Sequence, residues 1–172
     1  MFSVGVKLGK GGSWWIAIGF FLLTAAPGMW YPALPNILKA QGIEWVLPYA
    51  FAVGPLASLF TPLIFGSMAD YRFSAQKLVG TLSLLGAGFL GMAFYSLYMG
   101  WGAWWYLGFQ VLNALLGAPM WSLVSTVTLA NVDNAQKKFP LFRVWGSVGW
   151  VIAGLLVSWM GWDSSPLAGI AA

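Results

Sequence analysis

Five long apolar runs, nearly free of charged residues, dominate this sequence of 172 residues. A helix needs roughly 20 apolar residues to cross a bilayer, and each run is long enough. The connectors are short, so neighbouring helices must run antiparallel. We therefore expect one all-α integral membrane bundle over residues 1–172, with spans at about 14–38, 43–69, 76–99, 103–130 and 140–161.

The composition excludes most other classes of protein. Charged residues make up 7% of the chain, against about 25% in soluble domains. The chain has no cysteine and no histidine, which removes disulfides, thiolate metal sites and the commonest general base and metal ligand. We therefore expect neither an enzyme nor a metal or cofactor site. The net charge of +4 is explained by membrane topology, so no nucleic-acid partner is expected.

Basic residues gather on alternate connectors. One side holds Lys7, Lys10, Arg72, Lys77, Lys137 and Lys138, whereas the other side holds only Lys39. Cytoplasmic loops of membrane proteins carry the excess of Lys and Arg. We therefore expect a multi-pass protein of the inner (cytoplasmic) membrane with a cytoplasmic N-terminus. Tryptophans fit aromatic belts at the two boundaries: Trp14 and Trp15 inside, and Trp45, Trp101, Trp104, Trp105 and Trp162 outside.

The last residues, "WDSSPLAGIAA", resemble the start of another helix. Asp163, Ser164 or Ser165 can cap a helix, and Pro166 suits its first position. We expect residues 166–172 to begin a sixth span that stops short. A frayed tail is the alternative.

Prolines interrupt the first span in the segment "APGMWYPALP", which contains Pro27, Pro32 and Pro35. Each interior proline removes a backbone hydrogen bond and bends the helix. The bend either lines a central cavity or is only a packing kink. Prolines at 55, 62 and 119 repeat the pattern in the second and fourth spans, which favours a transporter or channel.

Polar residues of the fourth span fall on one arc at 100° per residue. The arc holds Gln110, Asn113, Gly117, Trp121, Thr128 and Asn131, with Ser125 at its edge. Such a face lines a water-filled path, or it bonds to a neighbouring helix.

The fifth span carries two stripes. Arg143, Ser147 and Trp150 share one face because their spacing is i, i+4, i+7. They offer a guanidinium, a hydroxyl and an indole, which suit a small polyhydroxylated solute with a ring that stacks on the tryptophan. The second stripe, Gly146, Gly149 and Ala153, is small enough for close packing against another helix.

The depth of Arg143 leaves a second interpretation open. Pro140 is expected to open the helix, which puts Arg143 only about 5 Å inside it. From there the guanidinium could snorkel to the headgroups beside Lys137 and Lys138.

Three stretches together resemble the N-terminal half of the major facilitator superfamily. The segment "FTPLIFGSMADYRFSAQK" is similar to the superfamily's signature between the second and third spans. Gly66 and Asp70 match it, Arg72 lies one place late, and Tyr71 and Ser74 replace the usual residues. The resemblance implies that Gly66, Asp70 and Arg72 serve the cytoplasmic gate.

The other two stretches indicate the solute class. "GMWYPALPNIL" is similar to the first span of the lactose permease group, and "FPLFRVWGSVGWVIAGLL" resembles the fifth span of the sugar:proton and, more closely, the nucleoside:proton symporters. The resemblance implies that Arg143, Ser147 and Trp150 bind the solute. Ser125, where the nucleoside branch often has an asparagine, and Trp30 are further candidates.

The implied function is proton-coupled symport of nucleosides or related sugar-like solutes by alternating access. This chain would be the N-terminal part of a twelve-helix transporter, with the proton-coupling carboxylates in the other half. The alternative is a truncated homologue that serves as a structural membrane subunit, and a homodimer that rebuilds a transporter ranks below both. Further spans encoded beyond Ala172 would favour transport, and a stop codon would favour the subunit.

Overall fold

The computed structural model describes residues 12–71, 75–132 and 134–172, with side chains from residues 14–61, 77–132, 134 and 136–172. The described residues form helices and no strands, in agreement with the predicted all-α class. The elements are α1 Gly12–Trp30, α2 Leu34–Ala40, the 3-10 turn η1 Glu44–Val46, α3 Leu47–Tyr71, α4 Ala75–Tyr98, α5 Ala103–Gly117, α6 Met120–Asn131, α7 Ala135–Trp159 and α8 Leu167–Ile170.

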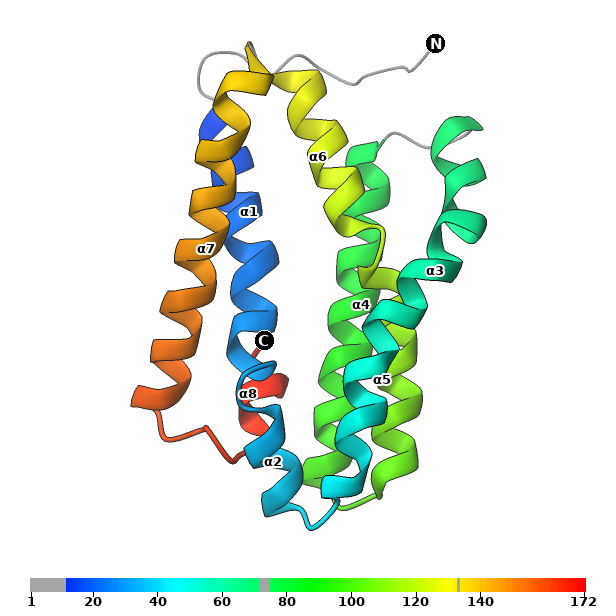
Figure 1. Ribbon diagram of the computed structural model, residues 1–172, viewed down its shortest axis with the longest axis vertical. Coiled ribbons are helices and arrows are strands. Elements are labelled where there is room, and N and C mark those ends of the chain that lie inside the picture. The colour runs from blue at the N-terminus through cyan, green and yellow to red at the C-terminus, as the bar shows by residue number, and fades with distance from the viewer. Residues whose placement is uncertain (1–11, 72–74, 133) are drawn as a thin grey trace.

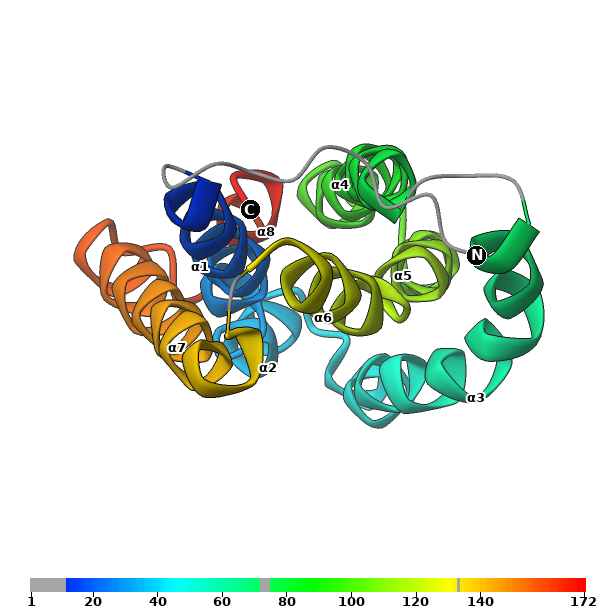
Figure 2. The ribbon, with the colours of Figure 1, turned by 90° about the horizontal axis from the view of Figure 1, so that it is seen from above.

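The long helices run alternately up and down, as the short connectors predict (Figure 1). α1 packs along α7, and α4 packs along α5. α3 lies on the outer side of α5, and α6 packs on α4, α7 and α1, so that it joins the two pairs (Figure 2). The short α8 packs against α4 and α1.

Four segments within the described residues are long and apolar enough to cross a membrane: Trp14–Ala40, Lys77–Tyr98, Ala103–Asn131 and Gln136–Trp159. They correspond to the first, third, fourth and fifth predicted spans. The second predicted span is α3, a helix of 25 residues whose side chains are described only as far as Thr61. The count of five spans therefore stays a prediction.

Prolines divide two of the spans. The first span separates into α1 and α2 at the turn formed by residues 31–33, which contains Pro32. The fourth span separates into α5 and α6 at Ala118 and Pro119. Proline has no N–H to donate, and its ring displaces the carbonyl of the preceding turn, so each helix changes direction there.

Glycines bring α1 and α7 into close contact, which confirms the small-residue stripe predicted on the fifth span. A Cβ added to Gly149 would overlap the backbone of Phe21, and one added to Gly28 would lie 2.8 Å from the carbonyl oxygen of Trp150. Ala153 is buried in the same interface, with 3% of its surface exposed. The two backbones can approach this closely only because side chains are absent at these positions.

The start of α7 differs from the sequence prediction. The expectation that Pro140 opens this helix is wrong, because α7 begins at Ala135 and contains Pro140. The missing N–H leaves only the carbonyl of Gln136 without its helical partner, and Gln136 is exposed at the helix end. Arg143 therefore lies about 12 Å along α7 rather than about 5 Å.

The main core lies at the end of the bundle that carries α2 and α8. Trp30, Phe94 and Tyr106 are buried there, and Trp30 packs on Phe94 with ring centroids 5.6 Å apart. α8 closes this core, because Gly169 contacts the ring of Phe94. A short helix does begin here, at Leu167, one residue later than predicted, and the backbone N–H of Leu167 donates to Ser165 Oγ at 3.3 Å. The sixth span itself stays a prediction.

Candidate functional site

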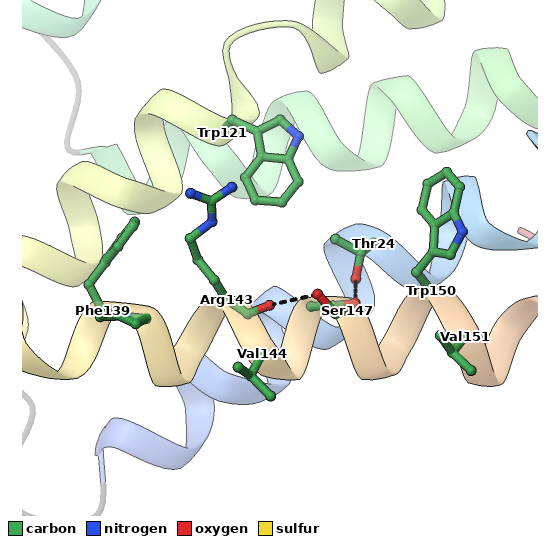
Figure 3. A pocket seen from close by; sticks show the side chains of 10 residues that line it. Thr24, Trp121, Phe139, Arg143, Val144, Ser147, Trp150 and Val151 are labelled. Atoms are coloured by element: carbon green, nitrogen blue, oxygen red, sulfur yellow. Dashed lines mark hydrogen bonds between the residues drawn. The ribbon is translucent and has the colours of Figure 1, made fainter.

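The stripe predicted on the fifth span faces a groove of about 650 Å³ between α7, α6 and α1 (Figure 3). Arg143, Ser147 and Trp150 all line it, so the structure brings the three main candidate residues together. α1 contributes Thr24, and α6 contributes Trp121. The other lining residues are Phe139, Pro140, Val144, Gly146 and Val151.

Arg143 supplies the positive charge of the groove. Its side chain is exposed and extends from α7 toward Trp121 (Figure 3). None of the ten lining residues is acidic. A guanidinium has five N–H donors and no acceptor, so this charge is available to acceptor groups of a solute.

Two hydroxyls lie beside the arginine. Thr24 is buried and donates across the helix interface to the carbonyl oxygen of Gly146, with the carbonyls of Phe20 and Phe21 also within 3.1 and 3.2 Å of its Oγ1. A hydroxyl has one proton, so only one of these bonds forms at a time. Ser147 Oγ lies 3.5 Å from the carbonyl oxygen of Arg143, at the limit of a hydrogen bond. The Ser147 hydroxyl is thus the freer of the two for a solute.

Trp150 forms an aromatic wall of the groove. Its ring centroid lies 6.2 Å from that of Tyr31, which in turn packs on Phe51 at 5.0 Å. With 37% of its surface exposed, Trp150 keeps a face open to the groove. Figure 3 shows Trp150 and Arg143 projecting from the same side of α7, with Ser147 between them.

Trp121 forms a second aromatic wall. Its ring lies 6.3 Å from that of Phe20, and Phe20 is completely buried between Phe139 at 5.9 Å and Phe142 at 6.3 Å. The indole of Trp121 is therefore held on one side, while 48% of its surface stays exposed. Two tryptophans, one from α6 and one from α7, therefore line the groove.

The two further candidates lie elsewhere. Trp30 does not line the groove, because it is buried in the main core with 7% of its surface exposed. Ser125 does not line it either, and its hydroxyl donates to the carbonyl oxygen of Trp121 at 2.6 Å. Both side chains are used in packing or in local helix bonds.

The predicted gate lies at the edge of the described structure. Gly66 and Asp70 belong to the last turns of α3, but their side chains are not described. Arg72 lies outside the described residues. The gating role therefore stays a prediction.

The polar arc of the fourth span does not form one face. Gln110 of α5 is buried, with 3% of its surface exposed, whereas Trp121 of α6 lines the groove. Thr128 is completely buried, and its hydroxyl donates to the carbonyl oxygen of Val124. The change of direction at Pro119 turns the two halves of this span toward different neighbours.

Sequence reasoning did not assign a solute role to two groove residues. Trp121 belonged to the predicted polar arc, but its place in the groove depends on the break between α5 and α6 at Ala118 and Pro119. Thr24 carries no sequence signal, because a threonine in an apolar helix ordinarily donates to the carbonyl one turn earlier. Only the packing of α1 on α7 brings its hydroxyl to Gly146.

A comparison with known families identifies the superfamily of the chain. The family model described as "MFS_1 like family" matches residues 13–163. The chain belongs to the major facilitator superfamily. This result confirms the family predicted from the three sequence stretches.

Two curated relatives belong to the same superfamily. The chain is 30% identical over 129 residues to a protein of Escherichia coli (strain K12) named "Putative nucleoside transporter YegT". The aligned region covers 74% of this chain and 29% of the relative. The chain is also 29% identical over 150 residues to the maltose permease of Geobacillus stearothermophilus, which covers 82% of this chain and 35% of the relative. No solved structure gives a significant match.

The chain thus spans about a third of the length of these two relatives. Both relatives carry the names of transporters, one of nucleosides and one of maltose.

Proposed function

We propose that this chain is the N-terminal part of a proton-coupled symporter that moves nucleosides or related sugar-like solutes by alternating access. The observation that carries the proposal is the groove in which Arg143, Ser147 and Trp150 meet. A guanidinium and a hydroxyl orient the polar groups of a solute, and an exposed indole stacks on its ring.

The polarity of the groove favours a solute with both an apolar ring and hydrogen-bonding groups. Trp121 and Trp150 line the groove together with the guanidinium of Arg143 and the hydroxyl of Ser147 (Figure 3). A nucleoside carries a flat base and a hydroxylated sugar, so it matches this combination of aromatic and polar groups. A sugar offers hydroxyls and one weakly apolar face, and it is the second choice. The names of the two relatives, a nucleoside transporter and a maltose permease, cover the same two solute classes.

The groove is proposed as half of a binding site. It is open, and it presents one charged residue without a carboxylate among its lining. In transporters built from two related halves, the solute lies near the middle of the membrane between them. A second helical bundle is proposed to close over α6 and α7 and to complete the contacts with the solute.

Proton coupling is assigned to residues outside the groove. Among the described side chains, the only carboxylates are Glu44 and Asp163, and both are exposed at one end of the bundle. A proton relay needs an ionisable group within the span. The coupling carboxylates are therefore proposed to lie in the second bundle.

The proposed orientation follows from the described basic residues. Lys77, Lys137 and Lys138 lie at the end of the bundle where α1 begins, whereas the other end holds one lysine, Lys39, with Glu44 and Asp163. An excess of lysine marks the cytoplasmic side. The N-terminus is therefore proposed to face the cytoplasm, with the Gly66, Asp70 and Arg72 gate on the same side.

Uptake by proteoliposomes tests the proposal. The complete protein that carries this chain is reconstituted, and uptake of labelled uridine, adenosine, maltose and galactose is measured with and without an inward proton gradient. We expect nucleoside uptake that exceeds sugar uptake and rises with the gradient. A gradient-independent rate would contradict proton coupling, and no uptake of any nucleoside or sugar would contradict the proposed solute class.

A further inference from the structure

One hydrogen bond joins α1 to α7 beside the groove. Thr24 of α1 donates to the carbonyl oxygen of Gly146 on α7, and among the described side chains no other hydrogen bond connects these two helices (Figure 3). The Thr24 Oγ1 lies nearer to this carbonyl oxygen than to those of Phe20 and Phe21 in its own helix. Thr24 is buried, so little water can compete for the bond.

The acceptor of this bond belongs to the turn of α7 that carries two groove residues. In a continuous α-helix the carbonyl of Gly146 also accepts the backbone N–H of Trp150, four residues later. A carbonyl oxygen has two lone pairs, so it can accept both bonds. Ser147 follows Gly146 directly and lines the groove with Trp150. The hydroxyl of Thr24 is thus bonded to the turn from which Ser147 and Trp150 project.

The absence of a side chain at Gly146 allows Thr24 to come this close. A Cβ added to Gly146 would lie 3.3 Å from Cγ2 of Thr24 and 3.5 Å from its Oγ1. Close packing at glycines limits the distance between the two helices. A hydrogen bond needs a defined distance and angle, so it also limits how far α7 can shift along α1.

We propose that Thr24 is a positioning residue of the solute site. Its hydroxyl fixes α7 along α1 and thereby fixes Ser147 and Trp150 in the groove. Thr24 acts through α7 rather than by donating to the solute, because its single hydroxyl proton is used in the bond to Gly146. This proposal rests on the proposed solute site, and it adds a residue from a helix to which the sequence pattern of α7 does not extend.

Thermal unfolding of the complete protein in detergent tests the link between the helices without any solute. Thr24→Val removes the hydroxyl and keeps a side chain of nearly the same shape. The matched control is Thr61→Val on α3, because Thr61 is also buried and its hydroxyl donates within its own helix, to the carbonyl oxygen of Ala57 at 2.7 Å. We expect Thr24→Val to melt about 1–3 °C below Thr61→Val. A melting temperature for Thr24→Val equal to or above that of Thr61→Val would overturn the link.

Solute affinity tests the positioning role. Binding of labelled uridine is expected to weaken roughly 2- to 12-fold in Thr24→Val, the usual effect of one lost hydrogen bond, while Thr61→Val binds as the unchanged protein does. Thr24→Ser keeps the donor and is expected to restore most of the affinity.

A residue that only packs the interface predicts the reverse order, because valine keeps the packing and serine loses a methyl group. Unchanged affinity in Thr24→Val, or no rescue in Thr24→Ser, would therefore contradict the positioning role. If the unchanged protein binds no nucleoside, the proposed solute class fails, and the comparison of melting temperatures still decides whether Thr24 links the helices.

Discussion

Gly149 is the single residue on which the fit of α1 against α7 depends most. A Cβ at this position would overlap the backbone of Phe21, which cannot move aside as a flexible side chain can. Gly149→Ala is therefore expected to destabilise the protein by about 1–3 kcal/mol, the usual effect of overpacking. The measurement is thermal unfolding in detergent.

Gly154→Ala is the matched control for this prediction. It lies on the same helix, and its added Cβ would meet only the carbonyl oxygen of Gly28, at 3.8 Å. Its melting temperature should equal or exceed that of the unchanged protein, since alanine favours a helix over glycine. A melting temperature for Gly149→Ala as high as that of Gly154→Ala would contradict the observed interface.

Helical periodicity allowed the sequence to predict which residues share one face of α7. The i, i+4, i+7 spacing placed Arg143, Ser147 and Trp150 on one face, and all three line the groove. Periodicity says nothing of contacts between helices. Trp30 illustrates the limit, because a tryptophan near prolines fits a cavity wall and a core equally well, and it lies in the core.

The kink between α5 and α6 is the element that positions Trp121. α5 packs on α3 and α4, whereas α6 packs also on α7, and Pro119 stands at the junction. Pro119→Ala is expected to straighten the span, since it restores the missing N–H. Trp121 then moves relative to Arg143, and nucleoside binding weakens by about tenfold, the factor that corresponds to ~1.4 kcal/mol of lost contact.

Equilibrium binding of labelled uridine checks this prediction, with Pro48→Ala as the control. Pro48 is exposed in the first turn of α3, where a proline breaks no helical bond. Pro48→Ala should bind as the unchanged protein does. Unchanged binding by Pro119→Ala would show that the kink does not position the site.

Elements themselves were more predictable than their ends. The apolar runs at 76–99 and 103–130 match the segments Lys77–Tyr98 and Ala103–Asn131 closely. The fifth span starts earlier than expected, because a proline near the start of a helix leaves only one exposed carbonyl unpaired. The rules for proline therefore predicted the helix breaks at Pro32 and Pro119 better than the first residue of α7.

The whole molecule presents its polar chemistry on one surface of an otherwise apolar bundle. α6 and α7 expose the groove, while the core of Phe94, Tyr106 and Trp30 lies at the other end. The chain covers about a third of the length of its two relatives, and the idea that the groove is half of a binding site stays a proposal. The contribution of Thr24 and Trp121 to the groove could not be predicted from the sequence, because only the packing of α1, α6 and α7 brings these distant residues together.

Binding of uridine to the Arg143→Ala variant is the sharpest test of whether Arg143 contacts the solute. Equilibrium binding to the complete protein is compared with that of Val144→Ala, which lies next in sequence and offers no donor. We expect Arg143→Ala to lose uridine binding while its expression stays normal, and Val144→Ala to keep its affinity within about threefold, less than 1 kcal/mol. Normal uridine binding by Arg143→Ala would contradict the proposed solute site and assign the arginine to the membrane surface.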